Sequence, residues 1–136
     1  MAGETAFKLP RILNYNNAGV GVVGVTIDGG GAVPATGQKG YIICPYKGLI
    51  FGASLVADQS GSCVIDVWKA SNSTVPTIAN SIAASALPTL SSAQIMLDLT
   101  LAGWATQVQA YDVFGFNLNS VSTIQRVTLE LLIRKQ

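Results

Sequence analysis

The sequence predicts an all-β protein: a single antiparallel β-sandwich or jelly roll of about seven to eight strands, behind an N-terminal extended arm. Apolar residues recur at every second position in several short segments, which is the period of a strand with one buried face. Clusters of Gly, Asp, Asn, Ser and Pro separate these segments, and no long helical period is found. Because 136 residues suit one domain, we expect an arm over residues 1–17 and a β-sandwich domain over residues 18–136.

The first expected strands follow the arm directly. Val23, Val25 and Ile27 alternate with small or polar residues, and the glycines at 29–31 end this segment. A short apolar strand is then expected over residues 40–44. The β-branched residues that dominate both segments are those that strands favour.

The middle of the chain predicts a hairpin and then a long connection. Residues 48–57 are expected to form a buried strand, and the Asp-Gln-Ser-Gly run at 58–61 is typical of a turn. The alternation over residues 63–67 predicts the returning strand of the hairpin. Residues 71–92 are rich in Ser, Asn, Thr, Ala and Pro and are expected to connect strands at the surface, with a short helical turn near residues 78–84.

Three further strands are expected in the last third of the chain. In each strand the alternating apolar residues are expected to supply the core, while polar and small residues face outward. The expected inward residues are Ile95, Leu97, Leu99 and Leu101, then Phe114, Phe116 and Leu118, and finally Val127, Leu129, Leu131 and Ile133.

The charge content predicts a surface that is partly covered. Charged residues make up 11% of the chain, against about 25% in ordinary soluble domains. A monomer with so few charges would be poorly solvated, so we expect other copies or a partner to cover part of it. The net charge is only +1 and the nearest basic cluster is Arg134-Lys135. Nucleic-acid binding is therefore not expected.

The residue types needed for most catalysis are missing. The chain contains no histidine, which excludes Ser-His and Cys-His nucleophiles and the commonest metal ligand. Cys44 and Cys63 cannot form a usual zinc site without a histidine, and we expect them to be free, buried thiols. The carboxylates fall at turns or, like Asp66, Asp98 and Glu130, on strand positions expected to face solvent. The sequence therefore predicts no enzyme, no metal and no cofactor.

Apolar residues of the arm and one tryptophan are candidate docking residues. The arm contains Phe7, Leu9, Ile12 and Tyr15, and Trp68 falls on the polar side of its strand. Large apolar and aromatic side chains commonly anchor interfaces. We therefore expect these five residues to contact a second copy or a partner.

A shallow sugar site is the alternative use of the aromatic residues. Exposed aromatic rings on a β-sandwich can stack on sugar rings, and Trp68, Trp104 and Tyr111 are the candidates for such a site. For Trp104, which follows a glycine at a strand end, packing under a loop is the expectation that we favour.

Targeting signals are not found in the sequence. The first eleven residues include Glu4 and contain no apolar core of a signal peptide. No stretch approaches the ~20 apolar residues that span a bilayer. We therefore expect a soluble protein that is made in the cytoplasm and does not contact a membrane.

Several short blocks in one order give the chain a family resemblance. They are Asp28-Gly29-Gly30-Gly31, Thr36-Gly37, Lys39-Gly40-Tyr41-Ile42, Ala57-Asp58-Gln59-Ser60-Gly61-Ser62, Val64-Ile65-Asp66-Val67-Trp68-Lys69, Pro88-Thr89-Leu90-Ser91-Ser92-Ala93, Leu101-Ala102-Gly103-Trp104, Tyr111-Asp112-Val113-Phe114-Gly115-Phe116-Asn117 and Arg126-Val127-Thr128-Leu129. Together they resemble a β-sandwich module of phage and prophage virion structural proteins, over residues 25 to 133. The resemblance implies a virion component that forms a homo-oligomer, often a trimer, with no catalytic residue.

Two functions are compatible with this resemblance. The first is a capsid decoration or cement protein that stabilises the head by oligomerising and docking on the major capsid protein. The alternative is a short tail fibre or receptor-binding tip that binds a glycan of the host surface. An enzyme, such as a small glycan hydrolase, has no support beyond the presence of carboxylates.

Overall fold

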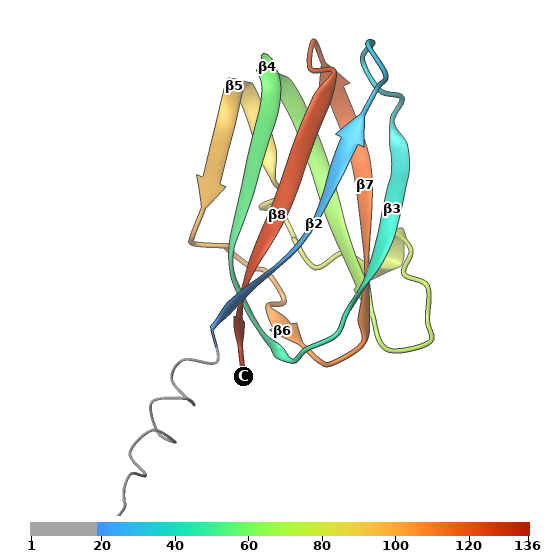
Figure 1. Ribbon diagram of the computed structural model, residues 1–136, viewed down its shortest axis with the longest axis vertical. Coiled ribbons are helices and arrows are strands. Elements are labelled where there is room, and N and C mark those ends of the chain that lie inside the picture. The colour runs from blue at the N-terminus through green and yellow to red at the C-terminus, as the bar shows by residue number, and fades with distance from the viewer. Residues whose placement is uncertain (1–18) are drawn as a thin grey trace, which may run out of the picture.

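The computed structural model describes residues 19–136 and is all-β, as the sequence predicts (Figure 1). The only helical element among these residues is a short 3₁₀ helix, η1, so no helix in them is long enough to cross a membrane. The expected arm over residues 1–17 lies outside the described residues. The elements are β2 (Val20–Asp28), β3 (Gly37–Cys44), β4 (Gly48–Ala70), η1 (Ile78–Asn80), β5 (Thr89–Asp98), β6 (Gln107–Val108), β7 (Asp112–Ser122) and β8 (Arg126–Lys135).

The strands form one antiparallel sheet that folds into two layers and nearly closes into a barrel. The strand order is β2-β8-β4-β7-β3, and both β5 and β6 also pair with β4. Strand β8 pairs with the first half of β4, and β7 pairs with the second half. Figure 1 shows β5, β4, β8 and β2 side by side in one layer, with β7 and β3 on the other side of the core. Strands β2 and β3 remain as edges, because no ladder joins them.

The expected hairpin over residues 48–67 is wrong, because these residues form one bent strand. The two halves of β4 pair with different neighbours and not with each other. Pairing with β5 becomes irregular on both sides of Gly61, and such bulges let a strand bend from one layer to the next. A Cβ at Gly61 would lie 2.7 Å from the carbonyl oxygen of Ser122. The glycine therefore permits the close packing at the bend.

Asp58 in the expected turn fastens the bend to the β7–β8 connection. Its Oδ1 atom accepts hydrogen bonds from the backbone N–H groups of Gln125 and Arg126, both at 3.1 Å. Desolvation acts to raise the pKa of this carboxyl, but these bonds and one from Gln59 outweigh it. The pKa of Asp58 therefore lies below its usual value.

The core lies between the two layers and confirms the alternation expected in β7 and β8. The inward residues of these strands are at most 1% exposed. They are Phe114, Phe116, Leu118, Val127, Leu129, Leu131 and Ile133.

The expectation fails in β5, where the apolar stripe faces outward. Ile95, Leu97 and Leu99 are exposed, and Met96 packs against the core in their place. Only Leu101 of the expected set is buried. A period-two pattern shows that a strand has an apolar face, but it does not show on which side that face lies. The exposed face of β5 is central to the candidate site.

Candidate assembly surface

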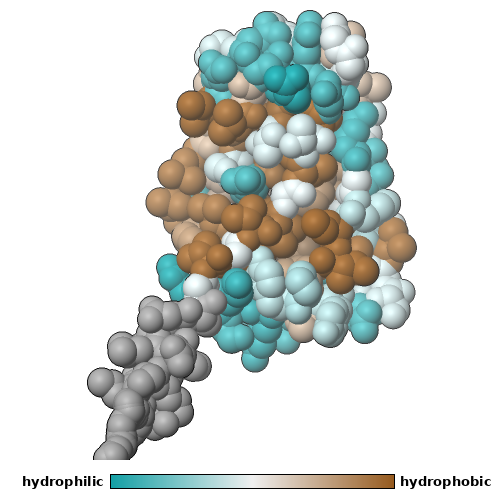
Figure 2. Space-filling model, viewed as in Figure 1, coloured by the Kyte–Doolittle hydropathy of each residue, from teal (hydrophilic) through white to brown (hydrophobic). Residues whose placement is uncertain are grey.

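The outer face of one layer carries a largely apolar surface, here called the bare face. Four strands contribute to it: β2, β8, the first half of β4, and β5 with the residue that follows it. Hydrophobic side chains gather over these strands in Figure 2. The bare face consists of Val20, Val22, Gly24 and Thr26 of β2, Thr128, Glu130, Leu132 and Arg134 of β8, Phe51, Gly52, Ser54 and Val56 of β4, and Ile95, Leu97 and Leu99.

Strand register aligns the bare face in rows across the layer. Val22 lies opposite Leu132, and Leu132 lies opposite Gly52. A Cβ at Gly52 would meet the Leu99 side chain at 2.8 Å and the Leu132 side chain at 3.0 Å. The glycine therefore lets two leucines close over the strand from both sides. The result is a central apolar row that crosses all four strands.

Several side chains of the bare face have large exposed fractions. Ile95 is 68% exposed, and Leu97 and Leu99 are about as exposed at 59% and 60%. Val22 and Val56 are each half exposed. Scattered exposed leucines are ordinary on proteins, but a contiguous apolar patch marks an interaction site. The low charge content of the chain predicts such a surface, although the sequence does not locate it.

Two opposite charges interrupt the apolar rows on β8. Glu130 and Arg134 are both exposed and lie two residues to either side of Leu132. The Arg134 guanidinium lies 4.7 Å from the centre of the Phe51 ring, in a cation–π contact. A shallow hollow of about 250 Å³ lies between β2 and β8, and Gly24 and Glu130 are among the residues that line it.

The outer face of the second half of β4 is covered by the chain itself. We call the outward residues Asp66 and Trp68 of β4, with Gly115 of β7, the covered face. A backbone bridge joins Trp68 to Ser81 in the connection, and Pro76 packs close to Gly115. Trp68 is only 7% exposed. The connection over residues 71–88 therefore covers the outer face of this half of β4, whereas nothing in residues 19–136 covers the first half.

The structure corrects the expectation that Asp66 faces solvent. Its carboxylate is buried and accepts two hydrogen bonds. One comes from Trp68 Nε1 at 3.0 Å and the other from Ser81 Oγ at 2.6 Å. Because a buried carboxylate is costly unless it is hydrogen-bonded, this pair of donors explains how an acid is tolerated under the connection.

The burial of Trp68 also removes it from the predicted docking residues. A ring that is packed within its own chain cannot anchor a partner on the surface of this structure. The other four, Phe7, Leu9, Ile12 and Tyr15, lie outside the described residues, and their part in docking stays a prediction.

The three aromatic residues of the predicted sugar site do not form an exposed cluster. Trp68 and Trp104 are buried, whereas Tyr111 is 56% exposed. The indole N–H of Trp104 donates a hydrogen bond to the Ala86 carbonyl at 2.9 Å. Trp104 therefore packs under a loop, which is the arrangement that we favoured from the sequence. Neither tryptophan therefore presents an exposed ring to a sugar in this structure.

A second apolar surface, the β3 groove, lies at the other edge of the fold. It is an open groove of about 770 Å³. Its walls combine apolar side chains with a polar turn. They are Tyr41, Ile42 and Ile43 of β3, the segment Asn72-Ser73-Thr74-Val75, and Val113.

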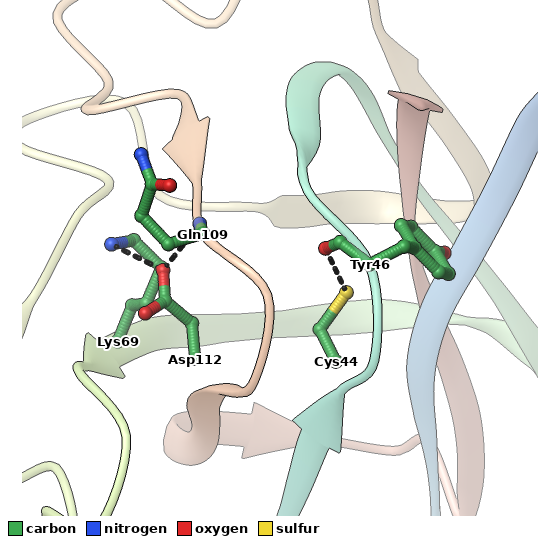
Figure 3. Close-up of polar contacts among 5 residues, drawn as sticks. All are labelled: Cys44, Tyr46, Lys69, Gln109 and Asp112. Atoms are coloured by element: carbon green, nitrogen blue, oxygen red, sulfur yellow. Dashed lines mark hydrogen bonds and ion pairs between the residues drawn. The ribbon is translucent and has the colours of Figure 1, made fainter. Parts of the chain in front are cut away.

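The buried polar groups near β3 are consistent with a structural role (Figure 3). The Asp112 carboxylate accepts hydrogen bonds from the Gln109 backbone N–H at 2.8 Å and from Lys69 Nζ at 3.2 Å. These partners tie the turn before β7 to the end of β4. Within residues 19–136 no group of three or more potential metal ligands lies together.

Both cysteines are free and buried, as the sequence predicts. Burial raises the pKa of the Cys44 thiol, and the nearby Asp112 carboxylate adds to this effect. The Sγ atom of Cys44 donates a hydrogen bond to the Tyr46 carbonyl at 3.4 Å. Burial likewise raises the pKa of Cys63. Since the thiolate is the reactive form, neither residue has the character of a nucleophile.

Comparison of the chain with protein-family descriptions, curated proteins and solved structures gives no match.

Sequence reasoning missed the bare face because it assigned the β5 stripe to the core. Two signals could have found it. The first is the low charge count of the whole chain. The second is Met96, an apolar residue between Gln94 and Asp98 on the opposite side of β5, which packs against the core.

Proposed function

We propose that this chain is a structural protein of a phage particle that decorates and cements the head shell. In this role it self-associates and docks on the major capsid protein, and it performs no catalysis. The observation that carries the proposal is the bare face, since a contiguous apolar surface needs a protein partner to cover it. The assignment to a phage particle is supported by the sequence blocks that resemble, in the same order, a phage virion module.

A cement protein stabilises a shell through many copies of one modest contact. Burial of apolar surface contributes roughly 25 cal/mol per Å², and leucine, isoleucine and valine side chains provide most of that surface on the bare face. The remainder of the fold supports a rigid platform, because β8 pairs along its whole length with β2 on one side and β4 on the other. Backbone pairing therefore holds the strands of the bare face in a fixed register.

The copy number of the chain in purified virions tests this proposal. Quantitative mass analysis of particles from the phage or prophage that encodes the chain should find hundreds of copies per particle. A few copies to a few dozen would assign the chain to the tail. Absence of the chain from purified particles would refute a virion role altogether.

A tail tip that binds a glycan is the second candidate, and the β3 groove favours it. Tyr41 is half exposed in this groove and lies beside the polar side chains of Asn72, Ser73 and Thr74. An aromatic ring next to hydrogen-bonding groups is the arrangement that holds a sugar ring. In this second proposal the sugar site uses Tyr41 instead of Trp68 and Trp104.

Binding to host cells separates the two candidates. A tail tip should bind host cells or extracted surface glycans, and Tyr41→Ala should abolish that binding while the fold is retained. A cement protein should bind neither cells nor glycans, and should instead bind shells from which it has been stripped.

A further inference from the structure

The charges on the bare face are arranged so that the surface complements itself. Glu130, Leu132 and Arg134 occupy successive outward positions of β8, with the apolar residue in the middle. Successive outward residues lie about 6.6 Å apart, since a strand rises about 3.3 Å per residue. An acid and a base therefore stand at equal distances on either side of Leu132.

A two-fold axis over Leu132 would pair these charges. If the axis lies in the interface and perpendicular to β8, a second copy faces the first with its β8 running in the opposite direction. Glu130 of each copy then lies opposite Arg134 of the other. A two-fold interface requires a surface that complements itself in this way. Val22, Leu132 and Leu99 of the two copies meet along the central row.

The hollow at Gly24 gives the second copy's arginine a place to bind. Gly24 lies directly opposite Glu130 in the β2–β8 ladder, and the hollow of about 250 Å³ opens beside that carboxylate. Val22 and Thr26 form its walls on β2. A guanidinium of the second copy that leaves its own Phe51 ring and enters this hollow would pair with the Glu130 carboxylate through a charge-assisted hydrogen bond.

The size of the bare face matches a modest interface. Four strands spaced about 4.8 Å apart give a width of about 19 Å. The overlap of the two copies along β8 is about 20 Å, so the flat contact covers roughly 400 Å² on each copy. The relief of the side chains increases the buried area, which places the total near the lower limit of specific interfaces, about 1,000 Å². The contact should therefore be reversible and depend on concentration.

From these observations we propose that the bare face binds the bare face of a second copy of this chain, with reciprocal Glu130–Arg134 pairs around a central Leu132 contact. This inference rests on the proposed function in that both need the bare face to be an association surface. It goes further by naming the occupant and the symmetry. The dimer is the unit that would be added to a larger assembly, in place of the trimer that the resemblance implies.

Charge reversal with the full chain tests the pairing. The molar masses of the wild type, Glu130→Arg, Arg134→Glu and the double variant are measured by sedimentation over a range of 1 to 200 μM protein. The wild type should change from monomer to dimer in this range. Each single variant places like charges opposite each other, and should weaken the dimer at least about ten-fold, because like charges that face each other across an interface repel. The double variant should recover most of the affinity, because the pairs are restored with opposite polarity.

A matched control reverses a charge outside the bare face. Lys39→Glu changes the charge by the same amount as Arg134→Glu, but Lys39 belongs to β3 in the other layer. It should dimerise like the wild type. Circular dichroism and thermal melting of every variant check that the fold is retained, and the double variant serves as evidence that neither substitution prevents folding.

The possible outcomes test the inferred dimer and the proposed function separately. A monomer throughout the concentration range, or a trimer, overturns the two-fold dimer. A dimer that is insensitive to all three charge variants overturns the face-to-face pairing. If that dimer is instead lost with Leu97→Ser, the bare face still associates, so the proposed function survives while the inferred symmetry fails.

Discussion

The two halves of β4 belong to one strand, but the outer face of the second half is covered and that of the first half is exposed. In the second half, Asp66 and Trp68 lie under the connection over residues 71–88, and both carboxylate oxygens of Asp66 have donors. In the first half, Val56 and the adjoining β5 stripe face outward with nothing from residues 19–136 over them. The comparison shows that the chain covers one outer face with its own connection and leaves the other exposed.

The largest expected effect lies on the covered face. Trp68→Ala should destabilise the protein by about 3–5 kcal/mol, because it removes a buried aromatic ring and leaves a cavity. Chemical denaturation followed by far-ultraviolet circular dichroism measures this change. Loss of less than 1 kcal/mol would mean that the connection does not pack on this half of β4, and the contrast between the halves would fail.

The hydrogen bonds of Asp66 give a smaller effect on the same face. Asp66→Ala leaves the Trp68 indole N–H and the Ser81 hydroxyl without their acceptor, and should cost about 1–3 kcal/mol. Asp66→Asn keeps an oxygen acceptor and should recover part of that loss. Equal stability of the two variants in denaturant titrations would show that the acceptor oxygen does not stabilise the covered face.

The stability that Asp58 contributes at the bend between the two halves of β4 should depend on pH. Because the pKa of Asp58 is lowered in the folded protein, its ionised form stabilises the fold above the unfolded pKa of about 3.9. That contribution is lost as the pH falls through the lower folded value. The stability difference between the wild type and Asp58→Asn should therefore be largest at neutral pH and should shrink below about pH 4. A difference that stays constant from pH 7 to pH 3 would contradict this assignment.

Substitution on the bare face should have the smallest effect on stability. Leu97→Ser should change the free energy of unfolding by no more than about 0.5 kcal/mol, because the side chain is largely exposed in the single chain. The same variant should reduce self-association. Denaturation at low micromolar protein measures the first effect, and sedimentation at high concentration measures the second. A large loss of stability in the dilute monomer would place Leu97 in the core after all.

The sequence predicts the class of the fold because its local signals agree. The alternation in β8 is correct residue by residue, and turn residues separate most of the strands. The hairpin over residues 48–67 was wrong because Asp58 and Gly61 shape a bend as readily as a turn; only the long-range pairing with β7 and β8 decides between them. In the same way, the position of the bare face depends on which side of β5 meets the core. A period of two does not show which side that is.

Among the residues predicted to bind, the outcome follows from the path of the connection. Trp68 falls on the polar side of its strand, as the pattern indicates, but residues 71–88 return to that strand through Ser81 and Ile82. A pattern within one strand does not contain this information. The exposure of Tyr41 could not be read from its segment, because a short run that is apolar on both sides is typical of a buried strand, whereas β3 lies at an edge of the sheet.

The central claim is that the bare face is covered by association while the covered face is not involved. The native thiols are buried and have raised pKa values, so a single introduced cysteine can be followed by its rate of maleimide labelling. Leu97→Cys reports on the bare face, and Ile78→Cys, which lies in η1 and is 73% exposed, is the matched control. Between dilute and concentrated protein, labelling at position 97 should slow several-fold, while labelling at position 78 should keep its rate. Equal rates at position 97 under both conditions would contradict the claim.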